Sequence, residues 1–222
     1  MSSAAFEMES VRPAVDTSAW SAPLSLSIPA GSFVTIVTSP TQAAMLFRIA
    51  LALDAPASGV VRVLGEVPHG LRRGALRMLR RRIGSCLLPD GLMANITLRA
   101  NVALPLVFGD GRAYDDANVR ADQVLTHFGL GHWADRRPSD LAPDTRQVAS
   151  LARAVAARPA LLFLHDPLTS VTNSEAVRLL TLSREYATTI VAAVHGEDEA
   201  VCMMADSSRV WDEQGYREIV RT

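Results

Sequence analysis

Residues 161–194 read LLFLHDPLTSVTNSEAVRLLTLSREYATTIVAAV. The stretch begins with a fully apolar run at 161–164 and ends with a second one at 189–194, and both runs are typical of buried strands. Residues 174–186 between them have the composition of a helix. A strand, a helix and a second strand in this order make a βαβ unit, whose two strands are parallel. The stretch therefore predicts an α/β fold built on a parallel sheet.

The rest of the chain adds further strands and helices around this unit. Strands are expected at 23–28, 33–37, 60–64 and 83–88, with a final strand pair at 209–219. Helices are expected at 43–53, 71–82 and 145–157, and residues 98–136 are mostly helical with a break at 108–111. Residues 1–18 mix acidic and small residues, lack the pattern of a signal peptide and are expected to be poorly ordered. Residues 19–222 are expected to form one domain, with a helical sub-domain at about 85–140.

Composition excludes several classes of protein. The chain has 222 residues and is 49% hydrophobic, which is enough for a sizeable core. Its net charge of −1 argues against a nucleic-acid-binding protein. Cys86 and Cys202 lie in no metal-binding pattern, and no metal site is expected. No apolar run reaches the roughly 18 residues that a membrane span needs.

A series of short motifs, all in one order along residues 24–215, resembles the ATP-binding subunit of ABC transporters. The matching pieces are IPAGSFVTIV at 28–37, APASGVVRVLG at 55–65, LARAVA at 151–156, LLFL followed by Pro167, and Val194 followed by His195. Residues 81–84 and 96–106 are most similar to the members that serve lipid and lipoprotein transporters. The resemblance implies a P-loop-ATPase-like core with a mixed, mainly parallel sheet, an N-terminal antiparallel β portion and an α-helical sub-domain.

The residues that hold phosphate in the glycine-rich loop of that family are missing from this chain. Such a loop needs the pattern GxxxxGK[ST], in which glycines expose backbone amides to the phosphates and one lysine holds them. All 22 basic residues here are arginine, so the chain has no lysine to supply. The corresponding positions form a degenerate nucleotide loop with no glycine: Thr38, Ser39, Pro40, Thr41, Gln42, Ala43, Ala44 and Met45. An ordinary strand-to-helix connection is expected there instead.

The other catalytic motifs of the family are altered as well. His165 and Asp166 stand where the resemblance implies a magnesium-binding Asp and a water-positioning Glu, and histidine is a poor ligand for magnesium. Among these catalytic positions, only His195 is the residue that the resemblance implies. Leu88 replaces the glutamine of the Q-loop, and Thr172 replaces the aspartate of the D-loop. The LSGGQ signature is reduced to Leu141, Ala142, Pro143, Asp144 and Thr145, where Asp144 is expected to cap the following helix.

The first functional hypothesis is a non-catalytic subunit of an ABC transporter, in which no residue is catalytic and His165, Asp166 and His195 are vestigial. Such a subunit would pair with itself or with an active ATPase, and ATP and magnesium would enter only through that partner. It would lie on the cytoplasmic side of the membrane, held there by a permease, in a system for lipid transport. The contact with the permease is expected at Pro89, Leu92, Met93, Leu104 and Leu106.

Two alternatives remain open at this point. The chain could be an active ATPase with a rebuilt site that uses Asp166 and His195, or a soluble regulator that uses the dimer face for another partner. The arginine-rich helix at 71–82 is either a solvated face or a surface for anionic lipid headgroups or an acidic partner.

Overall fold

The computed structural model describes residues 4–15, 18–87, 91–196, 199–212 and 215–219. Within these residues the strands form two sheets. A three-stranded antiparallel sheet has the order β2-β1-β4, and a six-stranded sheet has the order β5-β6-β7-β3-β8-β9. The nine strands are β1 (Ala4–Pro13), β2 (Leu24–Pro29), β3 (Phe33–Val37), β4 (Pro56–Val63), β5 (Ile83–Cys86), β6 (Leu161–His165), β7 (Thr189–Val194), β8 (Ser207–Asp212) and β9 (Gly215–Ile219).

The seven α-helices fall between these strands. They are α1 (Pro40–Ala50), α2 (Arg73–Arg81), α3 (Leu98–Leu104), α4 (Tyr114–His127), α5 (Pro143–Val155), α6 (Asn173–Arg184) and α7 (Glu199–Met204). A π-helical turn, Pro105–Gly109, continues α3. No helix of the described part is long and apolar enough to cross a membrane.

The six-stranded sheet confirms the predicted βαβ unit. Strands β6 and β7 are parallel neighbours, with Leu161 opposite Thr189 and Leu164 opposite Ala192. Every pairing in this sheet is parallel except the last, between β8 and β9. Each residue of β6 and β7 is buried, because helices or a second sheet cover both faces. This double cover explains why the two strands are uniformly apolar and do not alternate.

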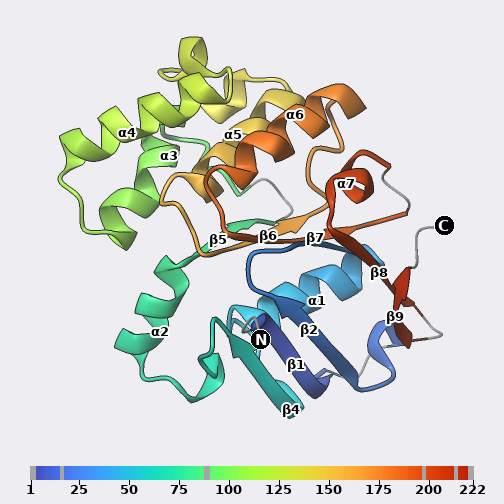
Figure 1. Ribbon diagram of the computed structural model, residues 1–222. Helices are drawn as coiled ribbons and strands as arrows, with labels where there is room; N and C mark the ends of the chain where they lie inside the picture. The colour runs from blue at the N-terminus through green and yellow to red at the C-terminus, as the bar shows by residue number, and fades with distance from the viewer. Residues whose placement is uncertain (1–3, 16–17, 88–90, 197–198, 213–214, 220–222) are drawn as a thin grey trace.

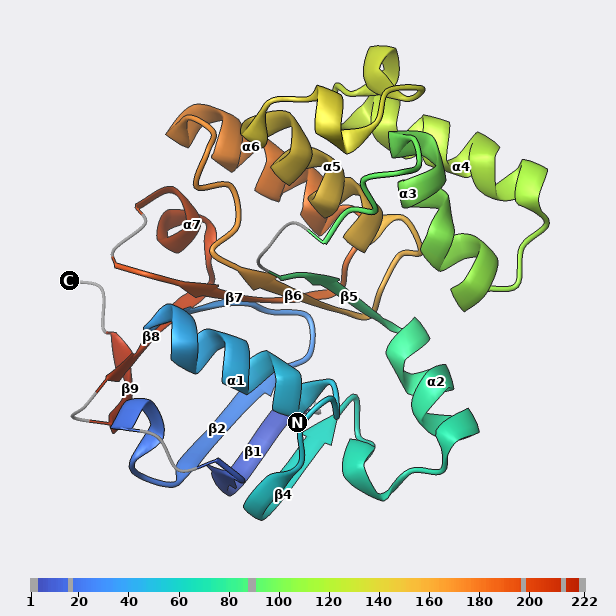
Figure 2. The same cartoon turned by 180° about the vertical axis from the view of Figure 1, so that it is seen from behind.

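The molecule is built in layers (Figure 1). Helices α3 to α6 cover one face of the six-stranded sheet, and α1 with the antiparallel sheet covers the other, as the reverse view also shows (Figure 2). The side chains of β6 divide accordingly: Leu162 and Leu164 join the core under the helices, whereas Leu161 and Phe163 join the core beside α1. Helix α2 lies to one side and buries only Leu79.

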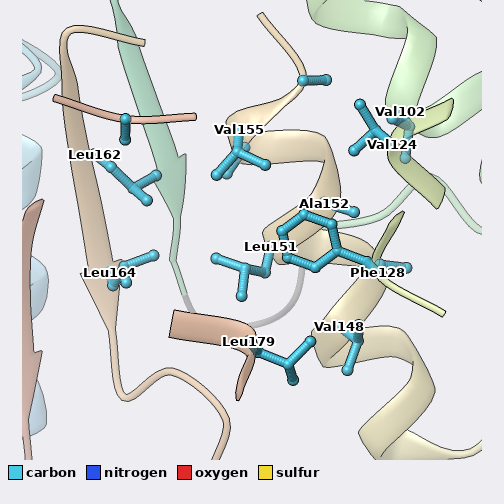
Figure 3. Close-up of a cluster of buried hydrophobic side chains, with 14 of the residues drawn as sticks. Val102, Val124, Phe128, Val148, Leu151, Ala152, Val155, Leu162, Leu164 and Leu179 are labelled. Atoms are coloured by element: carbon cyan, nitrogen blue, oxygen red, sulfur yellow. The ribbon is translucent and has the colours of Figure 1, made fainter. Parts of the chain in front are cut away.

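The core on the helical side brings β6, α5, α4 and α6 together (Figure 3). Leu151 and Val155 of α5 lie between Leu164 of the sheet and Phe128 at the end of α4, and all four side chains are buried. Helix α5 therefore attaches the helical sub-domain to the sheet, and the sub-domain has no separate core of its own.

The prediction of disorder for residues 1–18 is wrong for Ala4–Pro13, which is the central strand of the antiparallel sheet. Phe6 and Met8 are buried between β2 and β4. Glu9, which comes directly after Met8 and just before the bulge, is exposed. Gly59 permits the close crossing of β4, since a Cβ there would lie 2.5 Å from the carbonyl oxygens of Glu9 and Ser10. The acidic residues that suggested disorder are the outward half of a strand's alternation.

Candidate functional site

The predicted nucleotide loop is a connection of two residues, Thr38 and Ser39, between β3 and α1. Helix α1 begins at Pro40, three residues before the expected start, because Ser39 caps it. The Ser39 hydroxyl accepts a hydrogen bond from the Gln42 backbone N–H at 3.2 Å, and the Gln42 side chain accepts one from the Ser39 N–H at 3.1 Å. This reciprocal pair is a capping box.

The capping box changes what the start of α1 can bind. A helix N-terminus attracts phosphate because its first N–H groups lack partners within the helix. Here the amides of Ser39 and Gln42 are occupied by side chains of the same turn. Thr38 is also fixed, since its N–H donates to the Val194 carbonyl and its hydroxyl lies 2.9 Å from the Trp211 carbonyl oxygen. The amides of Thr38, Ser39 and Gln42 are thus already engaged, and Pro40 has no N–H to offer a phosphate.

Asp166 is placed just beyond the carboxyl end of β6, and its carboxylate has a structural partner. Oδ1 accepts the backbone N–H of His195 at 2.6 Å, and the Asp166 N–H donates to the Ala193 carbonyl at 2.8 Å. The residue has a φ of 39°, a left-handed conformation that aspartate tolerates better than most residues. Asp166 thus joins the end of β6 to the end of β7, and its carboxylate holds backbone where an ATPase would position water.

His165 is buried on the α1 side of the sheet, in the position where the resemblance implies a magnesium-binding carboxylate. Its side chain is 5% exposed and its ring lies 6.2 Å from that of Phe47 in α1. Burial lowers the pKa of His165, opposed by the nearby charge of Asp166, whose Oδ2 is 3.7 Å from Nε2. The imidazole is therefore neutral near pH 7 and Nε2 has no hydrogen-bond partner in the described part of the chain. A neutral ring among aromatic carbons offers no oxygen ligand to magnesium.

The remnant of the signature motif lies at the start of α5. The prediction that Asp144 caps this helix is wrong: Ala142 is the N-cap residue, Pro143 is the first helical residue, and Asp144 lies in the first turn. Its Oδ1 accepts the N–H of the next residue, Thr145. Proline is favoured at the first helical position, where its missing N–H would have no partner in the helix. Because Pro143 takes this position, the N-cap is Ala142, two residues before Asp144. The carboxylate of Asp144 is solvent-exposed.

The D-loop position has also become a helix cap. Thr172 is the N-cap residue of α6, and its hydroxyl accepts the Glu175 N–H at 3.4 Å. Gln147, which sequence reasoning did not single out, connects α5 to this region: its amide bonds Thr169 and the backbone of Ser170. Only the tertiary structure reveals that bridge, since the partners are 22 and 23 residues away.

The residues that the sequence analysis interpreted as vestigial partly come together. Thr38, Asp166 and His195 follow β3, β6 and β7, which are neighbouring strands, at one edge of the sheet. A cavity of about 180 Å³ lies between Asp166 and the start of α5. Pro143 and Gln147 line it on the α5 side. Leu88 and Pro89 lie outside the described residues. Among the described residues, no group of three His, Cys, Asp or Glu could hold a metal ion.

The residues expected to meet a permease divide into exposed and buried ones. Met93 is 47% exposed, and Leu92 and Leu104 are half-buried. Leu106 is fully buried in the core, so its prediction as a contact residue is wrong. The π-helical turn turns Leu106 inward and leaves Phe108 77% exposed. The turn arises at Pro105, which has no backbone N–H to donate to an α-helical bond.

These features can be compared with known proteins. Residues 22–169 match the ABC transporter family, which is two thirds of the chain and includes the capped turn, α5 and the end of β6. The chain belongs to the ABC transporter family. The match ends shortly before Thr172, so α6, β7 and the final strands lie beyond the part of the chain that it covers.

Two of the most similar curated relatives are transporter components with different cargo. The macrolide export ATP-binding/permease protein MacB of Syntrophobacter fumaroxidans is 34% identical over 188 residues, covering 81% of this chain and 26% of the relative. The methionine import ATP-binding protein MetN of Caulobacter vibrioides is 32% identical over 207 residues, covering 88% of this chain and 62% of the relative. The chain thus spans less than two thirds of either relative.

The solved structures agree on the fold. The ATP-binding cassette MJ0796, in a dimeric post-hydrolysis state bound to ADP and phosphate, has a TM-score of 0.83 and 22% sequence identity. The alignment covers 98% of this chain and all of that one. The ABC-type fold is therefore retained over nearly the whole chain, including the edge of the sheet that carries Thr38, Asp166 and His195.

Proposed function

We propose that this chain is a non-catalytic, nucleotide-binding-domain-like subunit of an ABC transporter complex. The observation that carries the proposal is the capping box at the start of α1, where the side chains of Ser39 and Gln42 occupy two of the backbone donors that a phosphate would need. The absence of lysine from the sequence supports it, because no ammonium group can replace the missing one.

The groups around the capping box support the same proposal. His165 is buried and neutral beside α1, and Asp166 is engaged by the His195 backbone. Phosphoryl transfer relies on positioned cations and an oriented water. His165 instead packs beside Phe47 and Asp166 bonds the backbone, so we assign this edge of the sheet a role as scaffold.

The proposed role is structural or regulatory and needs two partners. One is a second ATPase-type subunit, the same chain or an active relative, through the face that carries Asp144 and Thr172. The other is a permease, through the exposed residues of the helical sub-domain, Met93 and Phe108. The complex would lie on the cytoplasmic face of the membrane. MacB and MetN are named for a macrolide and for methionine, so the proposal assigns no cargo.

Calorimetric titration of the purified chain with ATP and Mg²⁺, up to millimolar nucleotide, tests the proposal directly. We expect no binding heat, since losing several charge-assisted hydrogen bonds of about 1.5–3 kcal/mol each moves the affinity out of range. The same titration of the methionine import ATP-binding protein MetN serves as the positive control. A one-to-one isotherm with micromolar affinity would replace the proposal by an active ATPase with a rebuilt site.

A further inference from the structure

Helix α2 and the residues around it carry charge of one sign only. Residues 67–89 contain six arginines and no aspartate or glutamate, in a chain whose net charge is −1. Residues three, four, seven and eight positions apart share one side of a helix, so four of these arginines lie together on one side of α2. The six are Arg72, Arg73, Arg77, Arg80, Arg81 and Arg82.

This arrangement opposes the formation of the helix that carries it. Like charges three or four residues apart repel one another on a helix, and positive charge in the first turn opposes the helix dipole. Arg72 is the N-cap residue of α2, Arg73 is its first helical residue, and the first turn has no acidic residue. Within the described part of the chain, neither Arg73 nor Arg77 has an ion-pair partner. A local conflict of this kind is expected where a binding partner supplies the missing charge.

Helix α2 is anchored to the fold on one side and uncovered on the other. It lies at the periphery of the molecule, beside β5, the edge strand of the six-stranded sheet (Figure 1 and, from behind, Figure 2). The anchor consists of the buried Leu79 and of Arg80, whose guanidinium donates to the carbonyl oxygens of Leu51 and Ala52 at 2.9 and 3.0 Å. The arginines of its first two turns are exposed. The helix is thus held in place while its basic side faces outward.

A cavity of about 520 Å³ lies along this basic side, between α2, β5, the end of α5 and the π-helical turn. Arg77 and Arg81 line it from α2, and Arg153 lines it from α5. None of the described residues that line this cavity is acidic. Its volume lies within the range of small-molecule sites. A phosphate group in this cavity would meet guanidinium groups, which bind phosphate oxygens through paired hydrogen bonds.

Two exposed apolar side chains flank the arginines. Phe108, 77% exposed, lines the same cavity, and Met78, 53% exposed, follows Arg77 in α2. Arg81 lies between them: Nη1 is 3.4 Å from the Met78 sulfur, and Nη2 is 3.6 Å from the carboxylate of Asp110, which follows the π-helical turn. Exposed apolar side chains among arginines are typical of surfaces that lie on anionic membranes. A free phosphate would leave both apolar side chains in water.

We infer that α2 and the π-helical turn form a surface that binds the anionic phospholipids of a membrane directly. A headgroup phosphate would enter the cavity of about 520 Å³, and the exposed arginines would meet neighbouring headgroups. Phe108 and Met78 would enter the interfacial region beside them. The inference goes beyond the proposed function, because the single chain makes this contact and needs no permease for it.

Sedimentation of the full chain with protein-free vesicles tests the inference. One set of vesicles is phosphatidylcholine alone, and the other is phosphatidylcholine and phosphatidylglycerol in equal parts. We expect at least about tenfold tighter binding to the second set, since each arginine near an anionic surface contributes about fivefold. Binding should weaken as sodium chloride is added, because salt screens the attraction. The vesicles contain no permease, so a negative result would leave the proposed transporter subunit untouched.

Arg73→Gln combined with Arg77→Gln is the most specific variant. It removes two exposed charges, so affinity for the phosphatidylglycerol vesicles should fall at least about tenfold. The melting temperature should be unchanged or raised, because repulsion within the helix is relieved. Replacing both residues by lysine keeps the charge and should keep most of the binding. Arg136→Gln with Arg137→Gln, at exposed positions between α4 and α5, is the matched control and should bind like the parent. Phe108→Ala should weaken binding at every salt concentration, since an apolar contact is not screened.

Four outcomes would overturn the inference. Equal binding to the two sets of vesicles would show that the headgroup charge is not recognised. Equal losses in the two double glutamine variants would show that binding follows net charge and not α2. Displacement from the vesicles by inorganic phosphate at matched ionic strength would assign the cavity to a free anion. If no vesicles bind and Arg73→Gln with Arg77→Gln reduces co-purification with detergent-extracted membranes, the surface binds an acidic protein instead.

Discussion

A single carboxylate, that of Asp166, joins the ends of two strands. It sits where the family's ATPases position water, yet its oxygen accepts the His195 N–H and its own N–H bonds Ala193. Its left-handed backbone suits aspartate or asparagine. The residue is thus explained by backbone geometry without any reference to phosphate.

Replacing Asp166 should therefore affect folding. Asp166→Ala removes the acceptor for the His195 N–H and forces alanine into a positive φ, so we expect the free energy of unfolding to fall by about 2–4 kcal/mol. Asp166→Asn keeps an acceptor oxygen, and asparagine tolerates the left-handed conformation. Its free energy of unfolding should fall by roughly 1 kcal/mol. Urea denaturation measures both. If the alanine variant is as stable as the parent but abolishes ATP hydrolysis by the assembled complex, the carboxylate is catalytic.

His165 should make stability depend on pH in a defined direction. Its pKa is lowered in the folded chain, by burial first, so the unfolded chain binds more protons on the acid side of the ordinary histidine value. The stabilisation from its neutral form is complete above pH about 6.5 and is lost as the pH falls through the lower folded pKa. The slope cannot exceed about 1.4 kcal/mol per pH unit for this one group.

Comparison of the parent with His165→Leu isolates that contribution. Urea midpoints measured from pH 7.5 to 5 should fall less steeply in the variant, because it has no imidazole to protonate. His132→Leu, in which an exposed histidine is removed, is the matched control variant. Parallel curves for the parent and His165→Leu would show that folding does not lower the pKa of the ring.

At the scale of elements, α1 shows that a family's most characteristic loop can be replaced by an ordinary helix start. Its buried face, including Leu46 and Phe47, still packs between the two sheets as the fold requires. The two-residue turn before it satisfies its own donors. The helix is therefore held by packing and capping, without help from a bound phosphate.

Ser39→Ala should measure the capping box. The variant leaves the Gln42 N–H without its acceptor at a helix end, and we expect a loss of about 0.5–2 kcal/mol in urea denaturation. Thr41 is exposed and lies two residues after Ser39. Thr41→Ala should therefore change the free energy of unfolding by less than about 0.5 kcal/mol. Equal stability of the two variants would mean that the cap contributes nothing in solution.

At the scale of the whole molecule, the helical sub-domain presents a mixed surface around the π-helical turn. Leu106 points into the common core, and Phe108 points outward two residues later. Asn101 is fully buried and fixes the segment before α3, since its side chain bonds the backbone of Met93, Ile96 and Thr97. The exposed residues are thus held on a rigid support, which suits a docking surface.

Leu106 and Phe108 should separate folding from assembly. Leu106→Ala opens a cavity in the core and should cost about 2–5 kcal/mol. Phe108→Ala should leave the stability of the isolated chain within about 0.5 kcal/mol but reduce the fraction of chain that co-purifies with detergent-extracted membranes. Co-purification that is unchanged in Phe108→Ala would remove this surface from the proposed permease contact.

The sequence by itself determined the order of strands and helices in the α/β core and the loss of the nucleotide motifs. Uniformly apolar β6 and β7 and the absence of lysine are local facts that need no coordinates. The alternation of apolar and polar residues predicted β2 equally well. The bounds predicted for β3 match those in the structure.

Only the tertiary structure decided the rest, because it depends on partners distant in the sequence. The strand at Ala4–Pro13 exists through pairing with β2 and β4, and the bond from Asp166 to His195 spans 29 residues. Leu106 is buried in a core that it shares with residues of α4 and α5. A cavity of about 540 Å³ joins residues near position 20 to others beyond 210. Hydrophobic periodicity reports which face of an element is buried, but it does not report what covers that face, and that choice is made when the layers pack.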